Sequence, residues 1–275
     1  MRSRKRGELA GRRVLVTGGA RGIGKATAAK LRREGMTVVI ADVDGDLARS
    51  VANELGIAGY RLDVTDLRAF TALVEDIEAR EGPIDALVNN AGIMPIGALI
   101  DQDPRLDDRQ IDVNLRGVIH GTRAVLPGMI RRRRGHLVNV ASVAGRVGVP
   151  YAAVYSATKH AVIGLSEALR HELAPEGIEV GYVVPALVRT ELISGTGIPR
   201  FPPPVAPEQV ADAVWRVLST GAVDVYVPSI GRLSQIVPAL LPRRWVEAVG
   251  RAFGIDRMFA TSNAGREAYV RRIRN

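Results

Sequence analysis

The chain has 275 residues, 47% of them hydrophobic, which is enough for one large α/β domain with a substantial core. It contains no cysteine and only four scattered histidines, so we expect no disulfide, no thiol catalysis and no metal site. The net charge is +9, but the basic residues are dispersed and only 4% of residues are aromatic, so we expect no nucleic acid partner.

Nothing in the sequence predicts a transmembrane or secreted protein. No apolar run approaches the roughly 20 residues that a spanning helix needs. Residues 1–11 form a basic tail that lacks the hydrophobic stretch of a secretory signal. Together with the absence of cysteine, these features lead us to expect a cytoplasmic protein.

The first predicted strand, residues 13–17, runs into a glycine-rich turn that leads to a helix over 25–33. The turn contains Gly18, Gly22 and Gly24 in the pattern Gly-x-x-x-Gly-x-Gly. Glycines permit a tight turn and close backbone approach, and the helix N-terminus offers free N–H groups to a pyrophosphate. Although any tight strand-to-helix turn can use glycine, this context predicts a dinucleotide site.

The second predicted strand, residues 37–41, ends at Asp42. A carboxylate at this position suits the hydroxyls of an adenosine ribose and repels a 2′-phosphate, and Val43 supplies no positive charge, so we favour NAD over NADP. Arg21, in the glycine turn, is an opposing feature because its guanidinium is able to pair with a 2′-phosphate. Asp42 also reads as a turn or helix-cap residue, since Asp44 and a glycine follow it.

Strands and helices continue to alternate along the chain. The predicted helices are 46–55, 66–80, 106–132, 155–174 and 208–218, and the strands between them are 58–62, 84–88, 135–141, 179–184 and 223–227. The strands are apolar and β-branched, as in sheets covered on both faces. This pattern predicts a single doubly wound parallel sheet with helices on both faces.

Ser142 directly follows the strand 135–141, at the sheet edge where ligands of such folds bind. Tyr155 and Lys159 are four residues apart and share one helix face. An ammonium one turn away favours the phenolate, so we expect Lys159 to lower the pKa of Tyr155. The pair alone is common on solvated helices, but with Ser142 it suits proton transfer at a carbonyl or alcohol oxygen.

These motifs together resemble those of the short-chain dehydrogenase/reductase family, over about residues 12–227. The matching residues, in chain order, are Thr17, Gly18, Gly22, Gly24, Asp63, Val64, Asn89, Asn90, Ala91, Gly92, Asn114, Ser142, Tyr155, Lys159, Pro185 and Thr190. The resemblance implies a Rossmann-like fold, and a homotetramer or homodimer built through the helices that carry Asn114 and Tyr155.

The resemblance also implies roles for four catalytic residues. Tyr155 is expected to be the general acid/base, and Ser142 to position the substrate oxygen. Lys159 is expected to lower the pKa of Tyr155 and to bind the nicotinamide ribose. Asn114 is expected to hold a water molecule that links Lys159 to solvent.

A larger set of residues is implied to bind the cofactor. It comprises Gly18, Arg21, Gly22, Ile23, Gly24, Asp42, Asp63, Val64, Asn90, Ala91, Gly92, Tyr155, Lys159, Pro185, Val188 and Thr190. The sequence departs from the family after the sixth strand, where Pro185 is followed by Ala186 instead of glycine. Alanine is small, so we expect the cofactor still to bind, although this backbone is less free to adopt a positive φ.

Residues 186–207 are rich in glycine and proline, and we expect them to form a lid over the substrate. The alternative is a rigid surface loop. The candidate walls of the substrate pocket are Ile93, Met94, Pro95, Val143, Tyr151 and Leu187. Because these residues are mostly apolar, we expect a lipophilic or ring-bearing alcohol or ketone.

We therefore expect residues 1–229 to form the dinucleotide-binding and catalytic domain, and residues 230–275 a helical extension of it. The extension mixes basic and apolar residues at helical spacing, which predicts packing on its own domain or a partner subunit, or alternatively contact with a membrane surface. The predicted function is NAD(H)-dependent oxidoreduction between an alcohol and a ketone or aldehyde. A non-catalytic dinucleotide-binding regulator and a membrane-docked scaffold are the alternatives.

Overall fold

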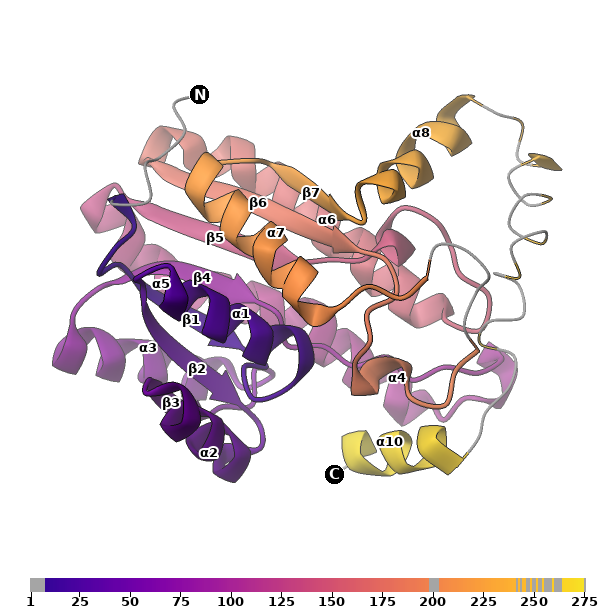
Figure 1. Cartoon of the computed structure of the whole chain (residues 1–275), viewed down its shortest axis with the longest axis horizontal. Coiled ribbons are helices and arrows are strands. Elements are labelled where there is room, and N and C mark those ends of the chain that lie inside the picture. The colour runs from indigo at the N-terminus through magenta and orange to yellow at the C-terminus, as the bar shows by residue number, and fades with distance from the viewer. Residues whose placement is uncertain are drawn as a thin grey trace.

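Seven parallel strands form one sheet in the order β3-β2-β1-β4-β5-β6-β7 (Figure 1). This computed structural model describes residues 8–197, 203–240 and 264–274, and in addition residues 242, 244, 245, 248, 251, 254 and 259. The strands are β1 (Arg13–Thr17), β2 (Thr37–Asp42), β3 (Ala58–Arg61), β4 (Ile84–Asn89), β5 (Gly135–Val140), β6 (Ile178–Pro185) and β7 (Asp224–Val227). The predicted doubly wound parallel sheet is confirmed.

Helices cover both faces of the sheet (Figure 1). They are α1 (Gly22–Arg33), α2 (Gly45–Leu55), α3 (Leu67–Glu81), α4 (Pro104–Ile111), α5 (Gly117–Arg132), α6 (Ala153–Leu173), α7 (Pro207–Thr220), α8 (Leu233–Leu240) and α10 (Ala264–Arg274). Apolar residues of α1, α2 and α7 pack on one face, and those of α3, α5 and α6 on the other.

The central strands are buried on both faces, which explains why their sequences are mostly apolar. Along β1, Val14 and Val16 pack with the α1 and α7 layer, whereas Leu15 between them packs with the α3 and α5 layer. Alternate side chains of a strand therefore meet helices on opposite faces, and the few polar residues on these strands, such as Asn89 and Asn139, are buried and hydrogen-bonded to each other. The carboxyl ends of all seven strands point toward the same edge, where the candidate site lies.

The predicted helix over residues 106–132 is interrupted. Its first turns form α4, and the segment Asp112–Arg116 is a π-helical turn that continues into α5. A π turn widens the helix by one residue and is common at functional sites. The turn carries Asn114, one of the predicted catalytic residues.

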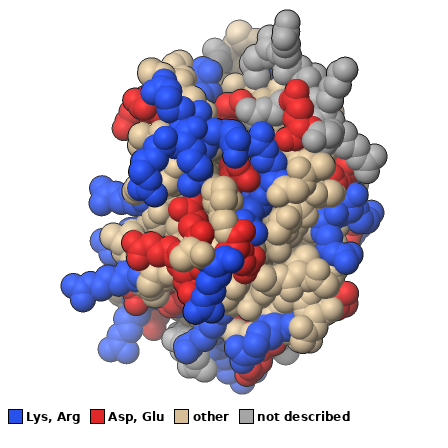
Figure 2. All heavy atoms as spheres, turned by 90° about the vertical axis from the view of Figure 1, so that its left-hand side faces the viewer, with Lys and Arg blue, Asp and Glu red and all other residues tan. Residues whose placement is uncertain are grey.

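The surface carries many ion pairs that offset its basic charge. Figure 2 shows basic and acidic side chains interspersed on the left-hand side of the view in Figure 1. At the amino-terminal edge of the sheet, Asp85 pairs with Arg12 at 3.3 Å and with Arg134 at 2.9 Å, and Glu78 pairs with Arg132 at 3.1 Å. Such pairing leaves less free positive charge than the composition alone suggests. The absence of a nucleic acid partner stays a prediction.

The described part of the chain contains no helix that is long and apolar enough to cross a membrane. Within the same residues, no three acidic or histidine side chains are grouped closely enough to hold a metal ion.

Candidate functional site

Two adjoining cavities of about 380 and 190 Å³ open at the carboxyl edge of the sheet. They share the lining residues Ile23, Asn90, Gly92, Thr190 and Leu192, so they form one continuous cleft. The larger cavity is also lined by the predicted cofactor residues Gly18, Arg21, Gly22, Asp42, Asp63, Val64 and Ala91. The smaller one is also lined by Ser142, Tyr155, Lys159, Pro185 and Val188.

The glycine turn forms one wall of the larger cavity. Gly18 has a φ of +61°, a conformation that glycine adopts without strain. A Cβ on Gly24 would lie 1.9 Å from the Gly18 carbonyl oxygen, so Gly24 packs beneath the turn and lines neither cavity. Helix α1 begins here without a side-chain cap, which leaves its first N–H groups able to bind an anion.

Asn90 fastens the glycine turn to the end of β4. Its side-chain amide donates to the carbonyl oxygens of Thr17 at 2.9 Å and Gly18 at 3.1 Å. In return, the Thr17 hydroxyl accepts hydrogen bonds from the backbone N–H groups of Asn90 and Ala91. The predicted cofactor residue Asn90 therefore also holds the turn in shape.

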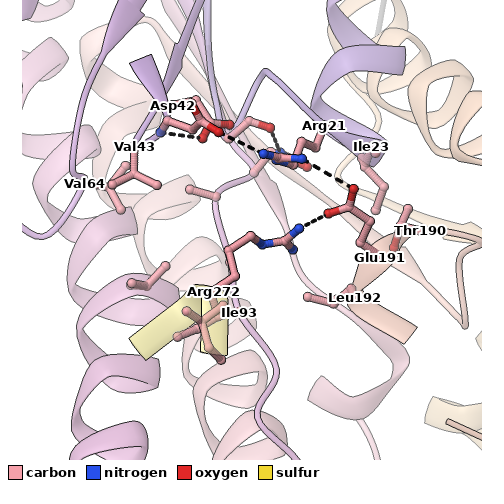
Figure 3. A pocket seen from close by; sticks show the side chains of 18 of the residues that line it. Arg21, Ile23, Asp42, Val43, Val64, Ile93, Thr190, Glu191, Leu192 and Arg272 are labelled. Carbon is pink, nitrogen blue, oxygen red and sulfur yellow. Dashed lines mark hydrogen bonds and ion pairs between the residues drawn. The ribbon is translucent and has the colours of Figure 1, made fainter. Parts of the chain in front are cut away.

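Asp42 lies at the far end of the larger cavity (Figure 3). Its carboxylate accepts hydrogen bonds from the N–H groups of Ala20 at 3.1 Å and Asp44 at 3.2 Å. Asp42 therefore also stabilises the turn after β2, as the alternative interpretation of this residue predicted. Burial raises the pKa of Asp42 above its usual value, and the two N–H groups oppose that shift. Arg21 pairs with Asp44 at 2.8 Å and with Glu191 at 3.5 Å.

Asp63 and Val64 line the same cavity beside Arg109, which the sequence analysis did not predict as a site residue. Arg109, on α4, pairs with the Asp63 carboxylate at 3.0 Å and donates to Thr65. Burial raises the pKa of Asp63, but its hydrogen bonds from Thr65 and Arg109 outweigh that effect and hold the pKa below its usual value. No local pattern predicts this pair, because its members are 46 residues apart.

The three polar side chains of the proposed proton-transfer group meet in the smaller cavity. The Ser142 hydroxyl hydrogen-bonds to the Tyr155 phenol and accepts from the Ala144 N–H at 3.1 Å. Lys159 donates to the Val140 carbonyl oxygen at 2.8 Å, with its ammonium 5.7 Å from the centre of the Tyr155 ring. All three residues therefore lie at the carboxyl end of β5.

The expected lowering of the Tyr155 pKa is wrong for this structure. Burial raises the pKa of Tyr155 to about 12, and the hydrogen bond from Ser142 only partly offsets it. Burial also lowers the pKa of Lys159 to about 8, so its charge is itself disfavoured. The sequence places Lys159 one helical turn from Tyr155 but does not reveal how deeply both are buried.

Asn114 is fully buried next to the cleft and does not line it. Its amide oxygen accepts from the Ile93 N–H at 2.8 Å, while its nitrogen donates to the Ile93 carbonyl at 2.8 Å and to Thr158 at 3.2 Å. A Cβ on Gly92 would come within 3.3 Å of the Asn114 oxygen and 3.7 Å of the Lys159 nitrogen. Asn114 thus lies behind Gly92, close to Lys159, and its predicted water relay stays a prediction.

The predicted pocket walls are partly wrong. Met94, Val143 and Leu187 line the smaller cavity, whereas Ile93 lines the larger one. Pro95 and Tyr151 line neither, because Pro95 is buried in the protein and the Tyr151 side chain is directed to the surface, 38% exposed. Walls that the sequence analysis missed are Ala144, Val147, Val149, Leu192, Ile193 and Phe259. All of them are apolar.

The backbone after β6 does not need glycine at position 186. Among the described residues other than glycine, only Arg133 and Tyr151 have a positive φ, so Ala186 is unstrained. Its N–H donates to the Val227 carbonyl at 2.8 Å. The loop that follows is fastened where Val188 pairs with Val205, and residues 198–202 of the predicted lid lie outside the described residues.

The C-terminal extension packs on its own domain, as one of the predicted alternatives required. Phe259 is buried in one apolar cluster with Tyr155 and Met94, and Tyr269 and Arg266 are also buried. Most of residues 241–263 lie outside the described residues, so the predicted amphipathic stretch is assessed only at its two ends.

Residues 12–197 match the sequence model of the family described as short chain dehydrogenase. The chain belongs to the short-chain dehydrogenase family. It is similar to the oxidoreductase UcpA of Salmonella typhimurium, with 37% identity over 74% of this chain and 79% of the relative. This membership confirms the family resemblance and the class of oxidoreductase.

Other members of the family are similar over comparable lengths. The 3-oxoacyl-[acyl-carrier-protein] reductase FabG of Thermotoga maritima is 40% identical over 67% of this chain and 77% of its own. The 3-alpha-(or 20-beta)-hydroxysteroid dehydrogenase of Mycobacterium bovis is 40% identical over 68% and 72%. The crystal structure of gox2181 superposes with a TM-score of 0.72 at 29% identity, covering 80% of this chain and 96% of that one.

Proposed function

We propose that this protein is an NAD(H)-dependent oxidoreductase that interconverts a secondary alcohol and a ketone, or a primary alcohol and an aldehyde. The observation that carries the proposal is the continuous cleft. It has a glycine turn and Asp42 at one end, and Ser142, Tyr155 and Lys159 at the other. A dinucleotide-sized groove that ends at a proton-transferring phenol is what alcohol–ketone exchange requires.

The chain's own residues account for the proton and the substrate oxygen. A bound nicotinamide dinucleotide supplies or accepts the hydride. With its pKa raised to about 12, the Tyr155 phenol holds its proton at neutral pH and suits donation to a carbonyl oxygen during reduction. Ser142, already hydrogen-bonded to that phenol, is placed to bind the same oxygen. In the reverse direction the phenol must first lose its own proton, and the Tyr155 phenolate then takes the proton from the alcohol.

Lys159 and Asn114 support this group from behind. Lys159 is held by the Val140 carbonyl and lines the smaller cavity, which suits it to bind a hydroxyl of the nicotinamide ribose. Asn114 holds the backbone of Ile93 on both its N–H and its carbonyl, which fixes the loop after β4 beside Lys159. We assign Lys159 to cofactor binding and Asn114 to positioning.

The larger cavity fits a dinucleotide without a 2′-phosphate. The glycine turn offers backbone N–H groups and no side-chain bulk, and the acidic side chains of Asp42 and Asp44 lie at the far end of the cavity, while Glu191 lies beside Thr190 (Figure 3). Arg21, the feature that favours NADP, is engaged by Asp44 and Glu191. The test is calorimetric binding of NADH and NADPH to wild type and Asp42→Ala. NADH preference that shrinks in the variant supports the assignment, and NADPH preference in wild type contradicts it.

The substrate that we propose is lipophilic or ring-bearing. The smaller cavity is walled by apolar side chains, with Ser142, Tyr155 and Lys159 as its polar groups beside Asn90 and Thr190. The hydroxysteroid dehydrogenase and the oxoacyl reductase among the relatives fit substrates of this kind. The test is NADH oxidation with ketosteroids, oxoacyl thioesters and short hydrophilic ketones. Faster turnover of the hydrophilic ketones would contradict the proposal.

We further propose residues 1–229 as the catalytic domain, with the loop 186–207 as its substrate lid, and a homotetramer or homodimer in solution. Light scattering of the purified chain tests the assembly, and a monomeric mass would contradict it. The alternative of a non-catalytic regulator predicts NADH binding without turnover of any ketone in the panel.

Contact with a membrane surface stays a hypothesis. The observation that favours it is the exposed apolar side chains of α8, Leu233, Ile236 and Leu240, of which Leu240 is 75% exposed. In Figure 1, α8 lies at the periphery of the molecule. Co-sedimentation with anionic vesicles, compared between wild type and Leu240→Asp, tests it. Absence of wild-type binding would rule it out.

A further inference from the structure

The C-terminal helix α10 closes one side of the larger cavity. Tyr269, Arg272 and Ile273 line this cavity together with the glycine turn and Asp42. In Figure 3, Arg272 extends from α10 toward Glu191 and Arg21 on the opposite side of the cavity. A segment from the end of the chain is therefore part of a site built mainly by its first half.

Two buried side chains anchor α10. Arg266 is only 2% exposed and donates to the carbonyl oxygens of Leu192, at 2.8 Å, and Met94. Its guanidinium stacks on the Tyr269 ring, 4.5 Å from the ring centre. The Tyr269 hydroxyl accepts from the Met94 N–H at 2.9 Å. Because Met94 follows β4 and Leu192 follows β6, the helix is fixed to the loops on both sides of the cleft.

A second and weaker connection lies at the cavity itself. Glu191 accepts from Arg272 on one side and from Arg21, at 3.5 Å, on the other. Arg21 also pairs with Asp44, so a chain of ion pairs runs from the end of β2 across to α10. The side chains of Arg21, Glu191 and Arg272 are 39%, 51% and 43% exposed. Ion pairs this exposed are weak and screened by salt, so this connection opens far more easily than the buried anchor.

We propose that α10 is part of the dinucleotide site, and that the ion pairs of Arg272 with Glu191 and of Glu191 with Arg21 form a latch that slows cofactor exchange. The inference rests on the proposed function, since it requires that the larger cavity bind the cofactor. Tyr269, Arg272 and Ile273 then contact the bound dinucleotide, while Arg266 holds the helix in position. Cofactor leaves when the latch opens.

The test is the rate of NADH release, measured by stopped-flow from the fluorescence of NADH itself, with excess non-fluorescent NAD as the chase. We compare the full-length wild type with Arg272→Ala and with Arg271→Ala. Arg271 is the matched control, because it is the neighbouring exposed arginine on α10 and does not line the cavity. Arg272→Ala is expected to release NADH about two- to fivefold faster than wild type, and Arg271→Ala at the wild-type rate.

Two further readouts separate a latch from a general effect on folding. Release from wild type is expected to accelerate with added NaCl more steeply than release from Arg272→Ala, since the variant has no latch to screen. Glu191→Gln is expected to release NADH faster as well, and the double variant no faster than the faster single variant, because both changes break the same connection.

Equal release rates and equal salt dependence in Arg272→Ala and Arg271→Ala would overturn the inference. The proposed function would still stand in that case, provided that the wild type binds NADH. Failure of the wild type to bind either NADH or NADPH would overturn the proposed function, and the inference with it. Thermal melting of each variant verifies that it is folded.

Discussion

Lys159 is predicted to destabilise the fold that it serves. It is 5% exposed, and burial lowers its pKa from 10.5 to about 8. A difference of about 2.5 units corresponds to roughly 3 kcal/mol of unfolding free energy lost when the ammonium is charged. Its hydrogen bond to the Val140 carbonyl returns about 1 kcal/mol. Lys159→Met, which keeps the volume, should therefore raise the free energy of unfolding by about 2 kcal/mol at pH 7.

The sign of the pH dependence follows from the direction of the shift. Because the pKa of Lys159 is lower in the folded protein, the penalty is complete below about pH 8 and disappears as the pH rises toward 10.5. Tyr155 acts in the opposite sense. Its pKa is raised from 10 to about 12, so the stability it contributes is complete below pH 10 and is lost above it. A change in the free energy of unfolding between pH 8 and 10 therefore reports on Lys159 and not on Tyr155.

Urea unfolding of wild type and Lys159→Met at pH 7 and pH 10 measures the effect. The advantage of the variant should shrink between the two pH values, and its turnover should be lost although it is the more stable protein. Lys25→Met is the control, because this lysine is 38% exposed and should show no such pH-dependent gain. If Lys159→Met is less stable than wild type at pH 7, interactions of the folded protein outweigh the cost of burying the ammonium, and the reasoning is refuted.

The remaining predictions concern the packing beneath the site, measured by urea unfolding. Gly24→Ala should cost about 3 kcal/mol or more, because its Cβ would lie 1.9 Å from a carbonyl oxygen, whereas the control Gly164→Ala, with no atom within 4 Å, should gain about 0.5–1 kcal/mol. Equal effects would contradict the close contact. Asn139→Ala should cost about 2–3 kcal/mol, since it leaves the buried Asn89 amide without its acceptor and removes the donor to the Ser166 hydroxyl, which keeps only its own hydrogen bond to the Val162 carbonyl. A cost below about 0.5 kcal/mol would mean that these groups find other partners.

The sheet was predictable because its strands have one environment. The side chains of Val14 to Val16 are buried on both faces of the sheet. A short apolar run of this kind, bounded by glycine or polar turns, has few possible structures other than a buried strand. The geometry of the glycine turn and of the end of β2, where we propose that the cofactor binds, was predictable for a similar reason. Gly18 and Asp42 act through backbone geometry and a strand end, which the local sequence specifies.

Contacts between distant segments were not predictable in the same way. The pair of Arg109 with Asp63 depends on how α4 lies against the segment that follows β3, and the π turn around Asn114 has no signal in the helical spacing of its sequence. The pKa of Tyr155 was predicted with the wrong sign, because spacing reveals a neighbouring charge but not the burial that outweighs it. The place of Tyr269 at the larger cavity depends on how α10 contacts the loops after β4 and β6, which no local pattern specifies.

The most direct test of the central claim is turnover by Tyr155→Phe, with NADH affinity measured on the same preparation. Removing the phenol oxygen removes the proton donor beside Ser142 and leaves the larger cavity unchanged. We predict that turnover of the best ketone from the panel falls at least about 100-fold while the NADH dissociation constant changes less than about threefold. Near-normal turnover in Tyr155→Phe would contradict the mechanism.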